Sequence, residues 1–169
     1  MRQGSSGRAS VNFIVDGMLG KLTRWLRMMG HNVKYSSKTD DPELLAITKK
    51  ENRVLLTRDF ALYQQAMAKS IGAYYVEGNT EPERLAELAQ RFNLTLAIDL
   101  ENSRCPRCNT KLNAVDKTEV TAKVEKNTLL HYNKFWLCQN CNHVYWQGAH
   151  WTKIRATLTK AQEKLKKKD

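Results

Sequence analysis

The chain has 169 residues, with 28 lysines and arginines against 17 aspartates and glutamates, which gives a net charge of +11. This excess favours a polyanionic partner, although it carries no information about chemistry. No apolar run reaches the roughly 18 residues that a transmembrane helix needs, and residues 1–10 lack the apolar stretch of a signal peptide. We therefore expect a cytoplasmic protein with no membrane association, in which 1–10 are a flexible start or the remnant of a tag.

From residue 11 the sequence alternates between short apolar runs and amphipathic segments. The runs predict strands at 11–15, 32–35, 54–57, 73–76 and, at an edge, 94–100. Helices are predicted over 19–29, from 41 onward, over 60–70 and from 80 to 92. Asp41 before Pro42 is typical of an N-cap followed by proline at the first helical position, and Thr80 with Glu83 predicts a capping box. This alternation indicates a three-layer α/β domain with a mainly parallel sheet over 11–102.

Four cysteines, the whole thiol content of the chain, fall into two C-x-x-C pairs: Cys105 with Cys108, and Cys138 with Cys141. Such pairs supply the four thiolates that tetrahedral Zn²⁺ binds at about 2.3 Å. Disulfides are disfavoured because nothing marks the chain as secreted, and a redox pair would not occur twice. His143 could compete as a ligand, but four thiolates suffice. A closed site of this kind is structural, because it leaves no position for substrate.

Residues 103–150 are therefore predicted to form a zinc ribbon. An alternating segment over 120–124, a turn near Asn127 and a strand through Phe135 and Trp136 would fill the interval between the two pairs. Residues 151–169 follow as a separate basic helix or tail, with seven basic residues against two acidic ones. Its apolar positions recur at helical spacing.

Carboxylates are predicted to gather at one edge of the parallel sheet. Asp16 ends the first strand, Asp41 follows the second and Asp59 follows the third, and parallel strands end at a common edge where ligands bind. Oxygen ligands select Mg²⁺ or Mn²⁺. Taken singly, each aspartate is better interpreted as a helix cap or turn residue, and only the three together favour a metal site. Asp40 and Asp99 are further candidates, and no phosphate-binding glycine loop or nucleophile elbow is present.

Several segments resemble one known family. They include 13–22 (FIVDGMLGKL), 25–30 (WLRMMG), 41–45 (DPELL) and 53–59 (RVLLTRD). The match resumes at 103–109 (SRCPRCN) and closes with 138–141 (CQNC) and 144–150 (VYWQGAH). In this order they are similar to the Mut-seven-type C-terminal RNase domain family, a zinc-ribbon branch of the PIN-like fold. The resemblance runs from about residue 13 to 154 and excludes both ends.

The resemblance implies a PIN-like domain that hydrolyses RNA at a Mg²⁺ or Mn²⁺ site, with a structural Zn²⁺ in the ribbon. It assigns the metal-binding, catalytic role to Asp16, Asp41 and Asp59. Asp40 or Asp99 would supply the fourth acid of a full site. Arg24, Arg27 and Arg58 become candidate contacts to the RNA backbone, although for Arg24 and Arg27 a solvated helix face is an equally good interpretation.

Two functions are consistent with these patterns. The first is a metal-dependent ribonuclease whose ribbon and basic end hold RNA, with ribosomal or transfer RNA as candidate substrates. The second is a non-catalytic RNA- or ribosome-binding protein that has kept a PIN-like framework. The sequence indicates neither the cut site nor the oligomeric state.

Overall fold

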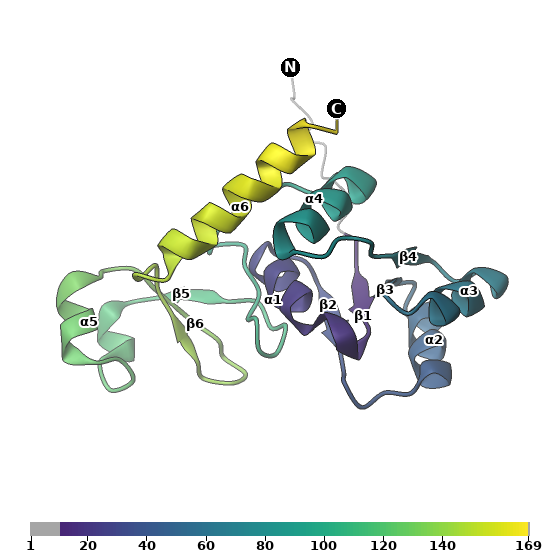
Figure 1. The fold of residues 1–169 in the computed structure, drawn as a ribbon. Helices are drawn as coiled ribbons and strands as arrows, with labels where there is room; N and C mark the ends of the chain where they lie inside the picture. Colours follow the sequence, from purple (N-terminus) through teal and green to yellow (C-terminus); the bar gives the residue numbers. More distant parts are fainter. Residues whose placement is uncertain (1–10, 169) are drawn as a thin grey trace, which may run out of the picture.

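The computed structural model describes residues 11–168, so the predicted flexible or tag segment at 1–10 lies outside the described part, as does Asp169. Figure 1 shows an α/β body, a smaller ribbon beside it, and a long last helix that leads from the ribbon back across the body. The elements of the body are β1 (Phe13–Val15), η1 (Gly17–Leu19), α1 (Gly20–Met28), β2 (Val33–Tyr35), α2 (Asp41–Lys50), β3 (Val54–Thr57), α3 (Phe60–Ala68), β4 (Ala73–Tyr75) and α4 (Glu81–Phe92).

The body is built on a four-stranded sheet in the order β2-β1-β3-β4, in which every pair is parallel. This confirms the predicted mainly parallel α/β fold. Successive residues of a strand point to opposite faces, so Phe13 and Val15 enter one core cluster and Ile14 enters another. The first cluster includes buried residues of α1 and α4, and the second includes those of α2 and α3. Helices therefore cover both faces, which gives three layers.

The order of the strands creates a switch point between β1 and β3. The chain leaves β1 through α1 on one face to reach β2, and it leaves β3 through α3 on the other face to reach β4. Neighbouring parallel strands whose connections leave to opposite faces open a crevice at their carboxyl ends, where such folds bind ligands. Asp16 directly follows β1, and Asp59 follows β3 after one intervening residue.

The predicted last strand over 94–100 is wrong, because residues 94–99 have no regular secondary structure. The segment is apolar because it packs on the core: Leu96 and Leu100 are buried. Its backbone finds partners outside any sheet, since the side chain of Gln162 donates to the Leu96 carbonyl over 2.7 Å. The segment is therefore an extended connection to the ribbon.

The ribbon carries a three-stranded antiparallel sheet in the order β5-β6-β7. Its elements are β5 (Asn113–Val115), η2 (Lys117–Val120), α5 (Lys126–His131), β6 (Phe135–Leu137) and β7 (Val144–Tyr145). The predicted strand in β6 is confirmed, but the alternating segment over 120–124 is not a strand and Asn127 lies in α5. Val120 and Val124 look like one face of a strand because both are buried in the cluster that holds Phe135. They enter this cluster from a 3-10 helix and the turns that follow it.

The last helix, α6 (Trp151–Lys166), packs on the body and is not a detached tail. Leu158 and Ala161 are buried in the same cluster as residues of β1, α1 and α4, and Lys164 pairs with Glu83 of α4 over 3.7 Å. The body core is thus completed by the segment that follows the ribbon. Among residues 11–168, no helix combines the length and apolar character needed to cross a bilayer.

Candidate functional site: a cysteine quartet and an acidic sheet edge

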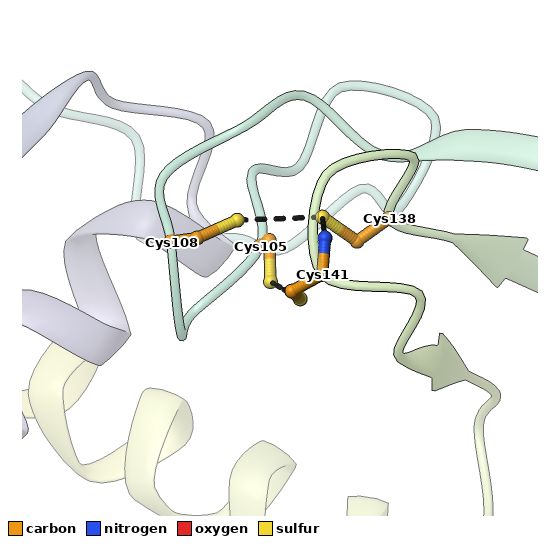
Figure 2. A group of neighbouring side chains, drawn as sticks. All are labelled: Cys105, Cys108, Cys138 and Cys141. Carbon is orange, nitrogen blue, oxygen red and sulfur yellow. Dashed lines mark hydrogen bonds between the residues drawn. The ribbon is translucent and has the colours of Figure 1, made fainter.

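The four cysteines converge from two loops, as Figure 2 shows. Their sulfur atoms all lie within 4.8 Å of one another. The Sγ atoms of Cys108 and Cys138 are 3.3 Å apart, and those of Cys105 and Cys141 are 3.6 Å apart. A disulfide needs about 2.05 Å, whereas thiolates around tetrahedral Zn²⁺ stand about 3.8 Å apart. The quartet could therefore hold a zinc ion, as a zinc ribbon requires.

Both loops close in the same way, through an asparagine that follows the second cysteine. Asn109 and Asn142 have φ of 73° and 60°, in the left-handed region where asparagine is better tolerated than most residues. In each loop the asparagine N–H donates to the carbonyl of the first cysteine, over 2.9 and 2.8 Å. The shared pattern C-x-x-C-N in the sequence carries this signal, and sequence reasoning had missed the role of the asparagine.

Burial sets the electrostatics of the quartet. It raises the pKa of the Cys105 thiol and raises the pKa of Cys138 to about 12. Burial acts in the same direction on Cys108, but hydrogen bonds with Thr110, Asn140 and Cys138 outweigh it, and the pKa of Cys108 falls to about 6. Thiols with raised pKa must lose their protons when a dication binds, so metal affinity increases with pH.

His143 lies beside the quartet without joining it. The only group of three or more histidine, cysteine or carboxylate ligand atoms close enough to hold one ion within residues 11–168 is the four sulfurs. The His143 carbonyl accepts from the Cys138 N–H over 3.0 Å, and its ring stacks edge-on against Tyr145. Tyr145 in turn places its hydroxyl 3.1 Å from the Cys105 sulfur. These residues surround the sulfurs and fix their orientation.

At the switch point, the ends of β1 and β3 are tied together by Thr57. The Thr57 hydroxyl donates to Asp16 Oδ2 and accepts from the Asp59 N–H over 2.9 Å. Asp16 is only 7% exposed, and its Oδ1 accepts from the Met18 N–H over 2.8 Å. One buried hydroxyl thus fixes the first acid relative to the backbone of the second. Sequence analysis did not single out Thr57.

The predicted capping roles of the acids are confirmed for two of the three. Asp16 caps η1, and Asp59 caps α3 by accepting from the Leu62 N–H over 3.1 Å. The prediction that Asp41 caps α2 is wrong, because Asp40 is the N-cap and accepts from the Glu43 N–H over 2.9 Å. Asp41 is the first helical residue, and its exposed side chain makes no hydrogen bond or ion pair among the described residues.

The three acids follow neighbouring strands at the carboxyl edge, but they do not form a compact ion cage. Within residues 11–168, Asp16, Asp41 and Asp59 do not constitute a second group of closely spaced ligand atoms. Asp99 lies elsewhere: it lines a hollow with Val11 and His31, which precede β1 and β2. Its carboxylate accepts from Asn102 within its own turn, over 2.6 Å. The structure therefore gives no support to Asp99 as a fourth acid.

The candidate RNA-contacting arginines differ in their surroundings. Arg27 is 7% exposed, and burial lowers its pKa despite the nearby thiols of Cys105 and Cys108. Its guanidinium donates to the carbonyls of Val33 and Pro106, so Arg27 does not lie on a solvated helix face, and its contact with RNA stays a prediction. The Arg58 guanidinium is bound to the loop after β4, at Gly78 and Asn79. Of these three arginines, Arg24 alone is exposed and has no side-chain partner among the described residues.

A three-layer parallel α/β body with carboxylates at its switch point, followed by a ribbon built on four cysteines, defines a PIN-like domain with a zinc-ribbon appendage. In a comparison with models of known families, residues 11–158 match the Mut7-C RNAse domain. This match spans most of the chain, and the protein belongs to that family. No curated protein and no solved structure matches the chain. The family indicates a ribonuclease-type function and an RNA substrate.

Proposed function

We propose that this protein is a metal-dependent ribonuclease that hydrolyses RNA phosphodiester bonds at the carboxyl edge of its parallel sheet. The observation that carries the proposal is the hydrogen-bonded link from Asp16 through Thr57 to Asp59, at the switch point between β1 and β3. A buried carboxylate held by a neighbouring strand is arranged for a charged ligand, since a cap alone requires neither burial nor the second contact. The family match supports the same conclusion.

The donor set at this edge fits a hard cation. Asp16, Asp41 and Asp59 offer only carboxylate oxygens, which Mg²⁺ and Mn²⁺ prefer. Because the acids do not form a compact cage, the arrangement fits an ion that keeps several waters and takes further oxygens from substrate, as Mg²⁺ does. A bound ion supplies charge that activates water and stabilises the leaving oxygen. Asp40, which caps α2 beside Asp41, remains the candidate for a fourth acid.

Neighbouring residues of the chain hold the carboxylates at this edge in position. Thr57 and the Met18 N–H leave Asp16 one defined orientation, and Asp59 keeps one carboxylate oxygen on the α3 cap. Asp41 stands unpaired at the start of α2.

We further propose that the cysteine quartet binds structural Zn²⁺, that the ribbon helps to hold RNA, and that the protein acts in the reducing cytoplasm, where four free thiols persist.

Cleavage of single-stranded and structured RNA by the purified protein tests the proposal, with Mn²⁺, Mg²⁺ or Ca²⁺ as the added cation. Asparagine caps a helix as well as aspartate does, so Asp59→Asn preserves α3 and removes only a charged ligand. We expect cleavage to fall roughly 100-fold or more. Asp116→Asn is the matched control, because Asp116 caps η2 in the ribbon. Equal cleavage by the two variants would refute the assigned site.

The alternative is a non-catalytic RNA- or ribosome-binding protein. It is favoured by the spacing of Asp16, Asp41 and Asp59, whose carboxylates are too far apart to form a closed ion site among the described residues. Tight, salt-sensitive RNA binding without cleavage under any of the three cations would establish this alternative.

A further inference from the structure

A cationic hollow lies between α1 and the first cysteine loop. It has a volume of about 490 Å³ and is lined by Lys21, Arg24 and Arg107, with the buried Arg27 behind them. No carboxylate from residues 11–168 lines it. Among the described residues, neither Lys21, Arg24 nor Arg107 takes part in an ion pair or a side-chain hydrogen bond. The three exposed cations repel one another, so this arrangement is stabilised when an anion binds.

Tyr35 connects the hollow to the acidic edge of the sheet. Tyr35, at the end of β2, lines the hollow and donates from its hydroxyl to the Gly17 carbonyl over 3.0 Å. Gly17 directly follows Asp16. A Cβ on Gly20 would lie 3.0 Å from the Tyr35 hydroxyl, so the missing side chain lets the ring approach the first turn of α1. An aromatic ring, 36% exposed, thus stands between the acid and the cations.

The opposite wall of the hollow depends on the cysteine quartet. Arg107 lies between Cys105 and Cys108, and the neighbouring Pro106 carbonyl accepts from Arg27 over 3.0 Å. The loop that carries Arg107 is therefore held by the sulfurs on one side and by α1 on the other. Arg107 on this loop and Arg24 on α1 line the same hollow.

We propose that this hollow is a subsite for the phosphodiester backbone of single-stranded RNA, which would run from the acidic edge over Tyr35 to the first cysteine loop. The proposal rests on the proposed function for the nature of the polymer. Arginines bind phosphate oxygens through a rigid fork of donors, and an exposed aromatic ring offers a stacking surface for any base. The RNA would then contact the α/β body and the ribbon at the same time.

The test measures binding of a fluorescein-labelled oligouridylate across a series of salt concentrations. All variants carry Asp59→Asn and Ca²⁺ replaces Mg²⁺, so that the probe stays intact. The subsite variant combines Arg24→Gln with Arg107→Gln. The matched control combines Lys49→Gln with Lys69→Gln, which removes the same charge from exposed positions at the ends of α2 and α3. A rescue variant combines Arg24→Lys with Arg107→Lys.

We expect the subsite variant to bind roughly tenfold or more weakly than the control. Its plot of log affinity against log salt should be shallower by about 0.7 for each lost phosphate contact. The rescue variant should recover most of that slope, because it restores the charge. Equal affinity and slope for the subsite variant and the control would overturn the proposal, as would failure of the parent protein to bind the probe. The expected result together with no cleavage of any RNA would uphold the subsite and refute the ribonuclease proposal.

Discussion

Arg27 and Pro106 are 79 positions apart, yet the Arg27 Nη1 donates to the Pro106 carbonyl over 3.0 Å. The same guanidinium donates from Nε and Nη2 to the Val33 carbonyl, over 3.0 and 2.8 Å. One buried side chain therefore joins α1, the start of β2 and the first cysteine loop. Its positive charge also faces a cluster that carries a net charge of about −2 when four thiolates bind Zn²⁺.

Replacing Arg27 by lysine should destabilise both the body and the cysteine site. Lysine keeps the charge but lacks the planar fork whose three nitrogens donate to the two carbonyls, and a buried acceptor left without a donor costs about 1–3 kcal/mol. Arg24→Lys, one turn earlier on the exposed side of α1, should leave the protein unchanged. Urea unfolding and competition with a chromophoric zinc chelator measure the two effects. Identical midpoints for the two variants would contradict the structural role of Arg27.

Asn109→Gly should lower stability more than Asn142→Gly. Glycine tolerates the left-handed backbone at both positions, so only the side-chain contacts differ. Asn109 accepts from the Val33 N–H over 2.9 Å and donates to Asn32 over 3.0 Å, whereas Asn142 accepts only from the exposed Lys123. The difference should be about 1–3 kcal/mol. Hydrogen exchange of the Val33 amide should accelerate in Asn109→Gly alone, and equal rates in both variants would argue against this anchor.

Thr57→Val should weaken RNA cleavage without unfolding the protein. Valine matches the shape of threonine but cannot donate to Asp16, so the acid loses its fixed orientation. Loss of such a supporting contact reduces metal affinity or activity by about 10- to 100-fold. Thr57→Ser keeps the hydroxyl and should retain most activity. The measurement is cleavage rate against Mn²⁺ concentration, and a serine variant as impaired as the valine variant would point to packing instead.

Leu158→Ala should destabilise the whole α/β body. Leu158 is 7% exposed and packs in the cluster that holds Phe13 and Leu88, and truncating a buried leucine costs about 2–5 kcal/mol. Leu130, 80% exposed in the ribbon, gives the matched control Leu130→Ala. Thermal unfolding followed by circular dichroism compares the two. A detached α6 would make both substitutions silent.

Acid should remove the stabilising contribution of Glu51. Hydrogen bonds from Lys34 and Arg53 lower the pKa of the Glu51 carboxyl from 4.5 to about 2. In the unfolded chain Glu51 takes up a proton as the pH falls through 4.5, whereas in the folded chain it does so only near pH 2. The contribution of Glu51 to folding stability is therefore complete above pH 4.5 and is lost as the pH falls from 4.5 to about 2. The urea midpoint of Glu51→Gln should lie below that of the parent at neutral pH and approach it in acid. Taking the difference at each pH cancels effects common to both proteins, and a difference that persists in acid would refute the linkage.

Much of the body could be predicted because its signals are local. Strand β3 has the bounds expected from its apolar run, and the capping box of Thr80 and Glu83 is present as expected. The strand prediction over 94–100 was wrong because the spacing of apolar residues indicates burial but does not show which groups the backbone hydrogen-bonds to. The strand predicted from Val120 and Val124 was wrong for the same reason, since helical turns can also bury both valines in one cluster.

The candidate site was predictable in composition but not in its contacts. The cysteine spacing predicted the quartet, and the ends of the strands predicted where Asp16 and Asp59 lie. The sequence could not show that Asp40 displaces Asp41 as the cap, because both residues can accept from the same turn. Nor could it distinguish Arg24 from Arg27. Helical periodicity places them three positions apart, and only the packing of the ribbon against α1 buries one and exposes the other.

The position of α6 has a consequence for biosynthesis. Its apolar residues complete the core of β1 and α1, but the ribbon is translated before it. During synthesis, part of the apolar surface of the body therefore stays uncovered until the ribbon and α6 have left the ribosome. Chains generally fold from their first domain onward as they emerge, so a nascent body without α6 is a target for chaperones. Both cysteine loops have been translated in this interval, before the last helix closes over the body.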